Sequence, residues 1–155
     1  MFRPRREFLP LSLGAASAGL SQHMAADDHV HSAIGSECVL FTALGKDMNS
    51  VADTPLVPKF VFTTYLITRI RVANASISLT TAAGGIYPSA AKAGTPLVAA
   101  GQAYAALTGP TLGLDLTLTA AALSGLSDLT LFWALTTAQG AAATADLRVI
   151  GIPLS

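Results

Sequence analysis

Apolar and polar side chains alternate along residues 59–74, which read KFVFTTYLITRIRVAN and contain neither glycine nor proline. β-Branched and aromatic residues that sort with a period of two are typical of a β-strand. One set of alternate positions, which includes Leu66, is apolar or threonine throughout, and we expect it to face the core. The other set begins apolar and ends in Arg69 and Arg71, so that end of the strand is predicted to meet solvent or a partner.

Shorter stretches repeat the alternation and are separated by segments rich in turn-forming residues. Further strands are therefore predicted at residues 36–43, 76–81, 97–107, 112–118, 129–136 and 146–154. Residues 45–58 read as a loop, Gly84 and Gly85 as a turn, and residues 138–145 as a hairpin tip. Residues 121–128 are expected to form a turn that includes one helical turn. The alternative for the alanine-rich segment 86–108 is a short helix.

This spacing of strands predicts an all-β fold, an antiparallel β-sandwich of jelly-roll or Greek-key type. We expect the sandwich to occupy residues 37–155 and residues 1–36 to form an extended N-terminal arm or linker. The arm carries Arg5 and Arg6, then Phe8, a weakly apolar stretch and the sequence HMAA. This outline also fits a twin-arginine export signal that is cleaved after about Ala26.

Histidine occurs three times, always within the predicted arm, at His23, His29 and His31. His29 and His31 are separated by one residue, so in an extended chain they point the same way, and three copies around an axis could offer six imidazoles to one metal ion. The motif is short and lies in a polar segment. We therefore predict a solvated linker there, with no metal site and no cofactor.

Charged residues make up only 12% of the chain, hydrophobic residues make up 52%, and the formal net charge is zero. A free monomer with so few charges is expected to be poorly soluble, so we predict that much of its surface is buried in a homo-oligomer. A membrane-spanning helix needs a run of about 18 or more apolar residues, and the sequence contains no such run. The small number of aromatic residues also argues against membrane insertion. A net charge of zero, together with few aromatic residues, argues against specific nucleic-acid binding.

The sequence contains no convincing catalytic constellation, and we predict that the protein is not an enzyme and has no catalytic or cofactor-binding residues. A nucleophile needs a base within reach, and every histidine lies in the arm. Arg69, Arg71 and Arg148 would form a small basic patch if their strands pair. Cys38 is the one cysteine, and we expect it to be a small buried residue, the alternative being a cross-link between copies.

Residues 63–94 and 114–154 resemble the small Ala/Thr/Gly-rich β proteins encoded among the head and neck genes of tailed bacteriophages and prophages. The resemblance implies a β-sandwich virion protein that decorates the capsid, forms the base of a head spike or surrounds the neck, often as a trimer or higher ring. Its partners would be further copies and capsid, portal or neck proteins. The alternative is a twin-arginine-exported β-domain that binds a ligand or surface.

Overall fold

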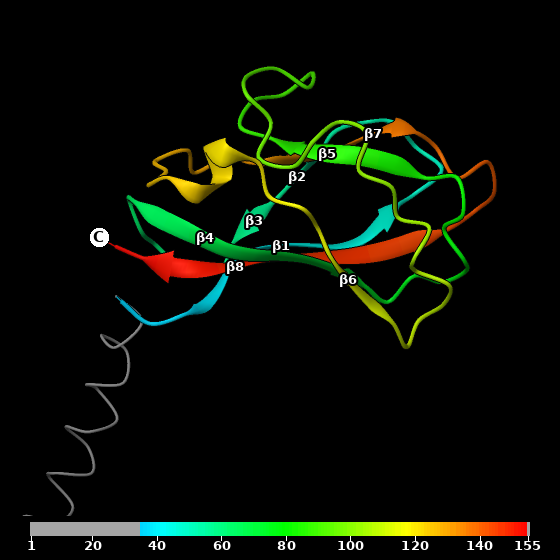
Figure 1. Ribbon diagram of the computed structural model, residues 1–155, viewed down its shortest axis with the longest axis horizontal. Helices are drawn as coiled ribbons and strands as arrows, with labels where there is room; N and C mark the ends of the chain where they lie inside the picture. Colours follow the sequence, from blue (N-terminus) through cyan, green and yellow to red (C-terminus); the bar gives the residue numbers. More distant parts are fainter. Residues whose placement is uncertain (1–34, 155) are drawn as a thin grey trace, which may run out of the picture. The chain divides into compact units, whose positions relative to one another are not determined.

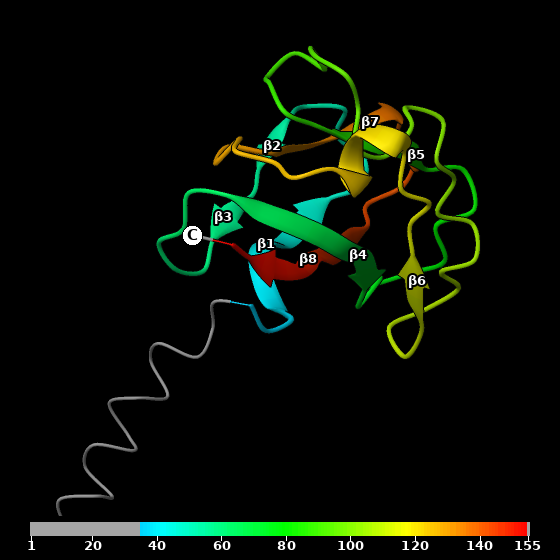
Figure 2. The same cartoon turned by 60° about the vertical axis from the view of Figure 1, so that its left-hand side comes forward.

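The computed structural model describes residues 35–154, and these residues form two antiparallel β-sheets that pack face to face (Figures 1 and 2). The larger sheet has the strand order β3-β1-β8-β4-β6, and the smaller has the order β2-β7-β5. The strands are β1 Cys38–Asp47, β2 Thr54–Pro55, β3 Val57–Pro58, β4 Tyr65–Ala73, β5 Ala83–Tyr87, β6 Gly113–Asp115, β7 Phe132–Thr137 and β8 Thr144–Pro153. The predicted antiparallel β-sandwich is confirmed, and the predicted arm lies almost wholly outside the described residues.

Strand β4 begins at Tyr65, and its first residues face the opposite way from the prediction. Tyr65 and Ile67 are buried and Leu66 is only half-buried, so the assignment of Leu66 to the core was wrong. The register between β4 and β8 shifts between Ile67 and Arg69, which marks a β-bulge. One extra residue exchanges the two faces of a strand, so Ile70, beyond the bulge, is buried as predicted.

Aromatic side chains fill the core between the sheets at the start of β4. The ring of Phe41 on β1 meets the rings of Phe62 and Tyr65 edge to face, with 5.3 Å between centroids in each pair. Edge-to-face contacts of this kind add to the free energy of burial. At the other side of the core, the Trp133 ring lies 6.0 Å from that of Tyr104, and the indole Nε1–H donates to the Tyr104 hydroxyl at 2.9 Å.

Gly84 and Gly85 do not form the predicted turn but lie buried within β5. A Cβ atom on Gly84 would come within 2.4 Å of the Ala134 carbonyl oxygen, and one on Gly85 within 2.4 Å of the Val98 carbonyl oxygen. These glycines are therefore explained by close approach of neighbouring backbone on both sides of β5.

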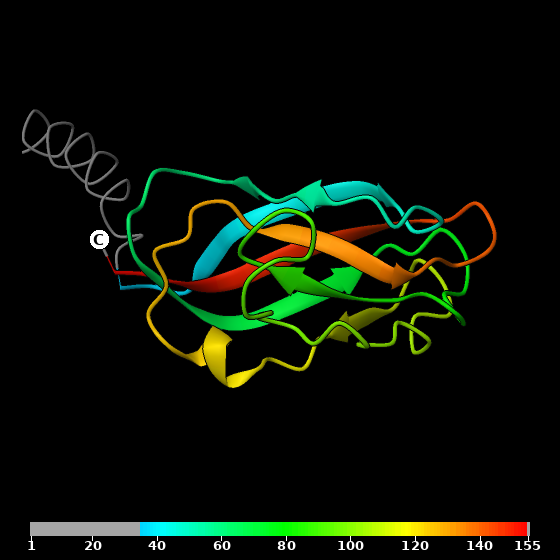
Figure 3. The same cartoon turned by 90° about the horizontal axis from the view of Figure 1, so that it is seen from above.

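The second half of the chain follows the alternation more closely. Leu131, Trp133 and Leu135 are fully buried around β7, and β8 covers the predicted last strand. Residues 138–143 are not a hairpin tip, because β7 and β8 belong to different sheets and this segment joins them. Figure 3 shows β5 and β7 lying over the strands of the larger sheet.

Several predicted strands are short or missing. Residues 76–81 form no strand, and Ile77 is 39% exposed although Leu79 is buried. Residues 97–107 form neither a strand nor a helix and contact β5 through single bridges. The predicted strand 112–118 is reduced to β6, whereas the predicted helical turn is present as η1, Ala120–Leu123.

The chain crosses from the smaller sheet to the larger one between β2 and β3. Each of these edge strands has two residues, and the buried Leu56 separates them. Pro55 and Pro58 lie in the two strands. Because proline has no backbone N–H to donate, these edges are poor templates for pairing with another strand.

Candidate functional site

The face of the larger sheet that points away from the core carries the three arginines considered in the sequence. Strands β4 and β8 pair so that Arg71 lies directly opposite Arg148, and Arg69 lies opposite Ile150. All three arginines are exposed. The structure therefore brings the predicted basic residues together on one surface, which we call the outer face.

Like charges directly opposite each other on a sheet are unfavourable, and the position of the Arg71 side chain reduces this cost. Its guanidinium group lies across Gly113 on β6, where a Cβ atom would be 2.4 Å from Nε. Its Nη1 atom is 3.5 Å from the Asp115 carboxylate, and both side chains are nearly half exposed. Arg71 thus turns toward β6, away from Arg148. Within residues 35–154, Arg69 and Arg148 have no ion-pair partner.

Acidic residues from distant parts of the chain also lie on the outer face. Glu37 precedes β1, and its carboxylate accepts a hydrogen bond from the Thr68 hydroxyl on β4. Asp146 on β8 accepts hydrogen bonds from the Gly45 amide and the Asn74 side chain, both at 2.7 Å. These bonds fix the two carboxylates in place but leave their negative charges without a cation within the described residues.

Half-buried aliphatic side chains lie beside the charges on the outer face. Val39 on β1 is the register partner of Ile150 on β8, and Leu66 on β4 is the partner of Ile152. Alternation places these four residues opposite the core, and each is intermediate in burial. Together they form an apolar strip that crosses three neighbouring strands.

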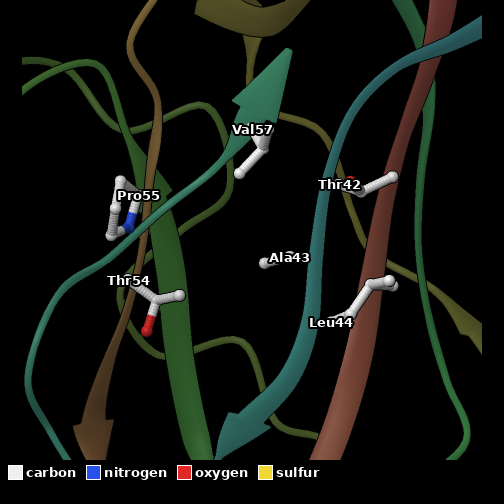
Figure 4. Close-up of a pocket in the computed structure, with 6 residues that line it drawn as sticks. All are labelled: Thr42, Ala43, Leu44, Thr54, Pro55 and Val57. Atoms are coloured by element: carbon white, nitrogen blue, oxygen red, sulfur yellow. The ribbon is translucent and has the colours of Figure 1, made fainter. Parts of the chain in front are cut away.

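A hollow of ≈ 470 Å³ opens at an edge of the sandwich. Figure 4 shows it between β1 and the segment that carries β2 and β3. The lining residues are Thr42, Ala43, Leu44, Thr54, Pro55 and Val57. Leu44 and Val57 are 65% and 59% exposed, so its rim is apolar and open to solvent.

A buried lysine lies behind this hollow and was missed by the sequence analysis. Lys46 is only 4% exposed, and its Nζ donates to the Ala52 carbonyl and the Thr54 hydroxyl, each at 2.9 Å. The same atom lies 5.7 Å from the centre of the Trp133 ring. Burial lowers the pKa of Lys46. Lys46 was predicted to lie in a loop, and this was wrong because β1 continues to Asp47. The register shift between Ala43 and Lys46 also means that alternation continued from the predicted strand would not turn Lys46 inward.

One end of the sandwich exposes several large apolar side chains, and we call it the apolar end. It is formed by residues 59–64, residues 123–131 and the chain after β8 (Figure 1). The Tyr65 hydroxyl donates to the Asp128 carbonyl at 2.6 Å, and the Leu154 amide donates to the Thr64 carbonyl at 2.9 Å, which holds these segments together. The exposed side chains are Val61 at 98%, Leu123 at 65%, Leu129 at 45% and Leu154 at 45%.

The remaining candidates do not assemble into a site. Cys38 is half-buried and packs against the core, and burial raises the pKa of its thiol. Among residues 35–154, no three His, Cys, Asp or Glu side chains are grouped as a metal site would require. His23, His29 and His31 lie outside the described residues, so the predictions about them stay predictions.

No family model, curated protein or solved structure matches this chain. In the part of the chain that the structure describes, no helix has the length and hydrophobicity needed to cross a membrane.

Proposed function

We propose that this protein is a non-catalytic assembly module, and that it serves as a structural virion protein on the head or neck of a tailed bacteriophage. The observation that carries the proposal is the apolar end, where four large aliphatic side chains are 45% to 98% exposed. Large apolar side chains exposed together at one end of a domain are typical of a site covered by another protein. The low proportion of charged residues supports the same conclusion.

The virion assignment rests on the resemblance of residues 63–94 and 114–154 to phage head and neck proteins. The compact sandwich fits this role, because residues from two sheets and a short crossing segment bury a continuous core within residues 35–154. Capsid, portal or neck proteins, together with further copies of the chain, are the proposed partners, and the virion is the proposed location.

Mass spectrometry of purified particles from a strain that carries the gene tests this proposal. We expect the chain in the particle at a copy number that matches one of its symmetric rings or the capsid lattice. The exported-domain alternative predicts a different result, a periplasmic chain whose N-terminus begins after about Ala26 and which is absent from particles. N-terminal sequencing of the chain from both fractions separates the two functions.

A further inference from the structure

The outer face of the larger sheet has the composition of an interaction surface. Its apolar strip consists of Val39, Leu66, Ile150 and Ile152, on three adjacent strands. Among residues 35–154, no strand or helix lies against this face, whereas the inner face of the same sheet is covered by β5 and β7 (Figures 1 and 3). Half-buried aliphatic residues on a broad sheet face are stabilised when a second apolar surface covers them.

The charges on this face indicate what kind of surface can cover it. The face carries three basic and four acidic side chains: Arg69, Arg71, Arg148, Glu37, Asp47, Asp115 and Asp146. Of these, only Arg71 and Asp115 pair with each other, which leaves two cations and three anions without an ion-pair partner in the described residues. An acidic partner would meet Glu37 and Asp146 as like charges, and a basic partner would meet Arg69 and Arg148. A second copy of the same face supplies both signs.

The strand register gives the arrangement that such a pair would adopt. Val39 and Ile150 form the row of the strip next to Arg148, which lies two residues along β8. Glu37 lies on the other side of that row from Arg148, held through Thr68 near Ile150. A two-fold axis that passes over Ile150, parallel to the sheet and perpendicular to the strands, turns one copy face to face with the other. It brings Arg148 of each copy toward the partner's Glu37 and stacks the Val39 and Ile150 rows of the two strips. Such a contact uses the same patch on both copies, as a closed dimer requires.

The edges of the sheets offer a less suitable route to self-association. Pro55 and Pro58 occupy the two-residue edge strands β2 and β3, and the opposite edge of the larger sheet is the three-residue β6. Short edges that contain proline disfavour strand addition. A face contact therefore fits this sandwich better than an edge contact.

From these observations we propose that two copies of this protein pair through the outer faces of their larger sheets, with Arg148 of each copy against the partner's Glu37. This inference builds on the proposed assembly role and names one of its contacts. The apolar end stays free in such a dimer for a different protein.

Sedimentation velocity and native mass spectrometry of the full chain test the proposal. We expect wild-type protein at micromolar concentration to have twice the 15.8 kDa monomer mass. Arg148→Glu and Glu37→Lys should each weaken the dimer about tenfold or more, because each sets two like charges against each other across the contact. Mixing the two variants should restore a heterodimer, since the reversed charges again meet opposite charges. Asp128→Lys, an exposed substitution at the apolar end, is the matched control and should leave dimerisation unchanged.

Three results would overturn the proposal. The first is a wild-type monomer throughout the micromolar range. The second is an oligomer whose mass is unaffected by Arg148→Glu and Glu37→Lys, which would place the contact on another surface. The third is loss of the dimer in both variants without recovery on mixing. A chain that is monomeric in solution yet present in purified particles would refute this dimer and leave the proposed virion function standing.

Discussion

The two ends of the sandwich are built in different ways. The three segments of the far end, residues 48–53, 74–82 and 138–143, all join one sheet to the other. At the apolar end, residues 59–64 connect β3 to β4 within the larger sheet, whereas residues 123–131 lead to β7 in the smaller one. The segments of the far end are held by polar side chains. The Gln139 amide accepts hydrogen bonds from the Thr81 and Ala82 amides and donates to the Ser78 carbonyl at 3.1 Å. The Asn49 side chain accepts a hydrogen bond from the Gly140 amide at 2.9 Å.

The apolar end has aromatic packing beneath it and exposed aliphatic residues above. Phe62 is buried and Val61, next to it in the chain, is 98% exposed. The far end also exposes apolar side chains, Val51 at 49%, Ile77 at 39% and Leu112 at 46%, but polar side chains bond much of its loop backbone. This difference supports the proposal that the apolar end, rather than the far end, meets a partner.

The largest expected effect on stability is that of replacing Phe62, and replacement of its neighbour Val61 should have almost none. Phe62→Ala should lower the free energy of unfolding by about 3–5 kcal/mol, because it removes a buried ring that contacts Phe41, Phe60 and Tyr65. Val61→Ala is the matched control and should change it by less than about 0.5 kcal/mol. Chemical denaturation of both variants measures the difference. Equal effects would show that residues 60–64 do not enter the core as the structure has them.

Gln139→Ala should produce the next largest effect, at the far end. We expect a loss of about 1–3 kcal/mol, because the Thr81 and Ala82 amides and the Ser78 carbonyl lose their partner. Ala142→Ser, an exposed change in the same segment, is the control. If thermal melting of Gln139→Ala matches that of the wild type, water replaces the glutamine and the far end is less specifically built than we infer.

The pH dependence of stability tests the packing of Tyr65 at the apolar end. Burial raises the pKa of Tyr65, with a smaller contribution from Asp128. Above about pH 10 the tyrosine ionises in the unfolded chain and stays protonated in the folded one, so folding stability should fall by about 1.4 kcal/mol per pH unit. In Tyr65→Phe this part of the slope should vanish. The comparison with wild type cancels the opposite contribution of Lys46, whose lowered pKa makes stability rise toward pH 10.5.

Measurement of unfolding in urea at a series of alkaline pH values gives both slopes. Tyr104→Phe serves as a second reference, because Tyr104 is also buried with a raised pKa but lies beside Trp133. An identical slope for Tyr65→Phe and wild type would mean that Tyr65 is open to solvent, which would contradict the packing of the apolar end.

The smallest expected effect on stability is that of Leu123→Ser, at an exposed position of η1. We expect a change in the free energy of unfolding within about 0.5 kcal/mol. The variant should nevertheless bind purified particles more weakly than the wild type, because it removes apolar surface that the proposed partner covers. Ile77→Ser at the far end is the control for particle binding, and equal binding by wild type and Leu123→Ser would place the contact elsewhere.

Burial was predicted correctly from the sequence where a strand runs without a shift of register. Leu131, Trp133 and Leu135 are buried as their alternation indicates. The prediction for Leu66 was wrong because a bulge adds one residue to β4, and nothing in the local pattern marks that position. Gly84 and Gly85 were wrongly predicted to form a turn. Glycine is required there because the backbone of Ala134 and Val98 comes close, and these contacts with distant segments are not visible in the local sequence.

The candidate site was predictable only in part for the same reason. Arg69 and Arg71 alternate on one strand, so their shared face followed from the sequence, and pairing with β8 then added Arg148. Glu37 reaches the same face through Thr68, thirty-one residues away in the chain. The inward position of Lys46 depends on the register shifts of β1. Contacts between distant segments set these positions, and a period-two pattern does not contain them.

The position of β8 has a consequence for how the chain folds during synthesis. This strand is the last in the sequence, yet it lies between β1 and β4 at the centre of the larger sheet. Cys38 on β1 can therefore pair with its register partner, Gly151 on β8, only after almost the whole of the intervening chain has been made. Loop closure over such a separation is slow, and the sheet cannot form until residue 153 has left the ribosome. Until then, β1 and β4 lack the strand that pairs with both of them, so we expect the nascent chain to expose their apolar residues.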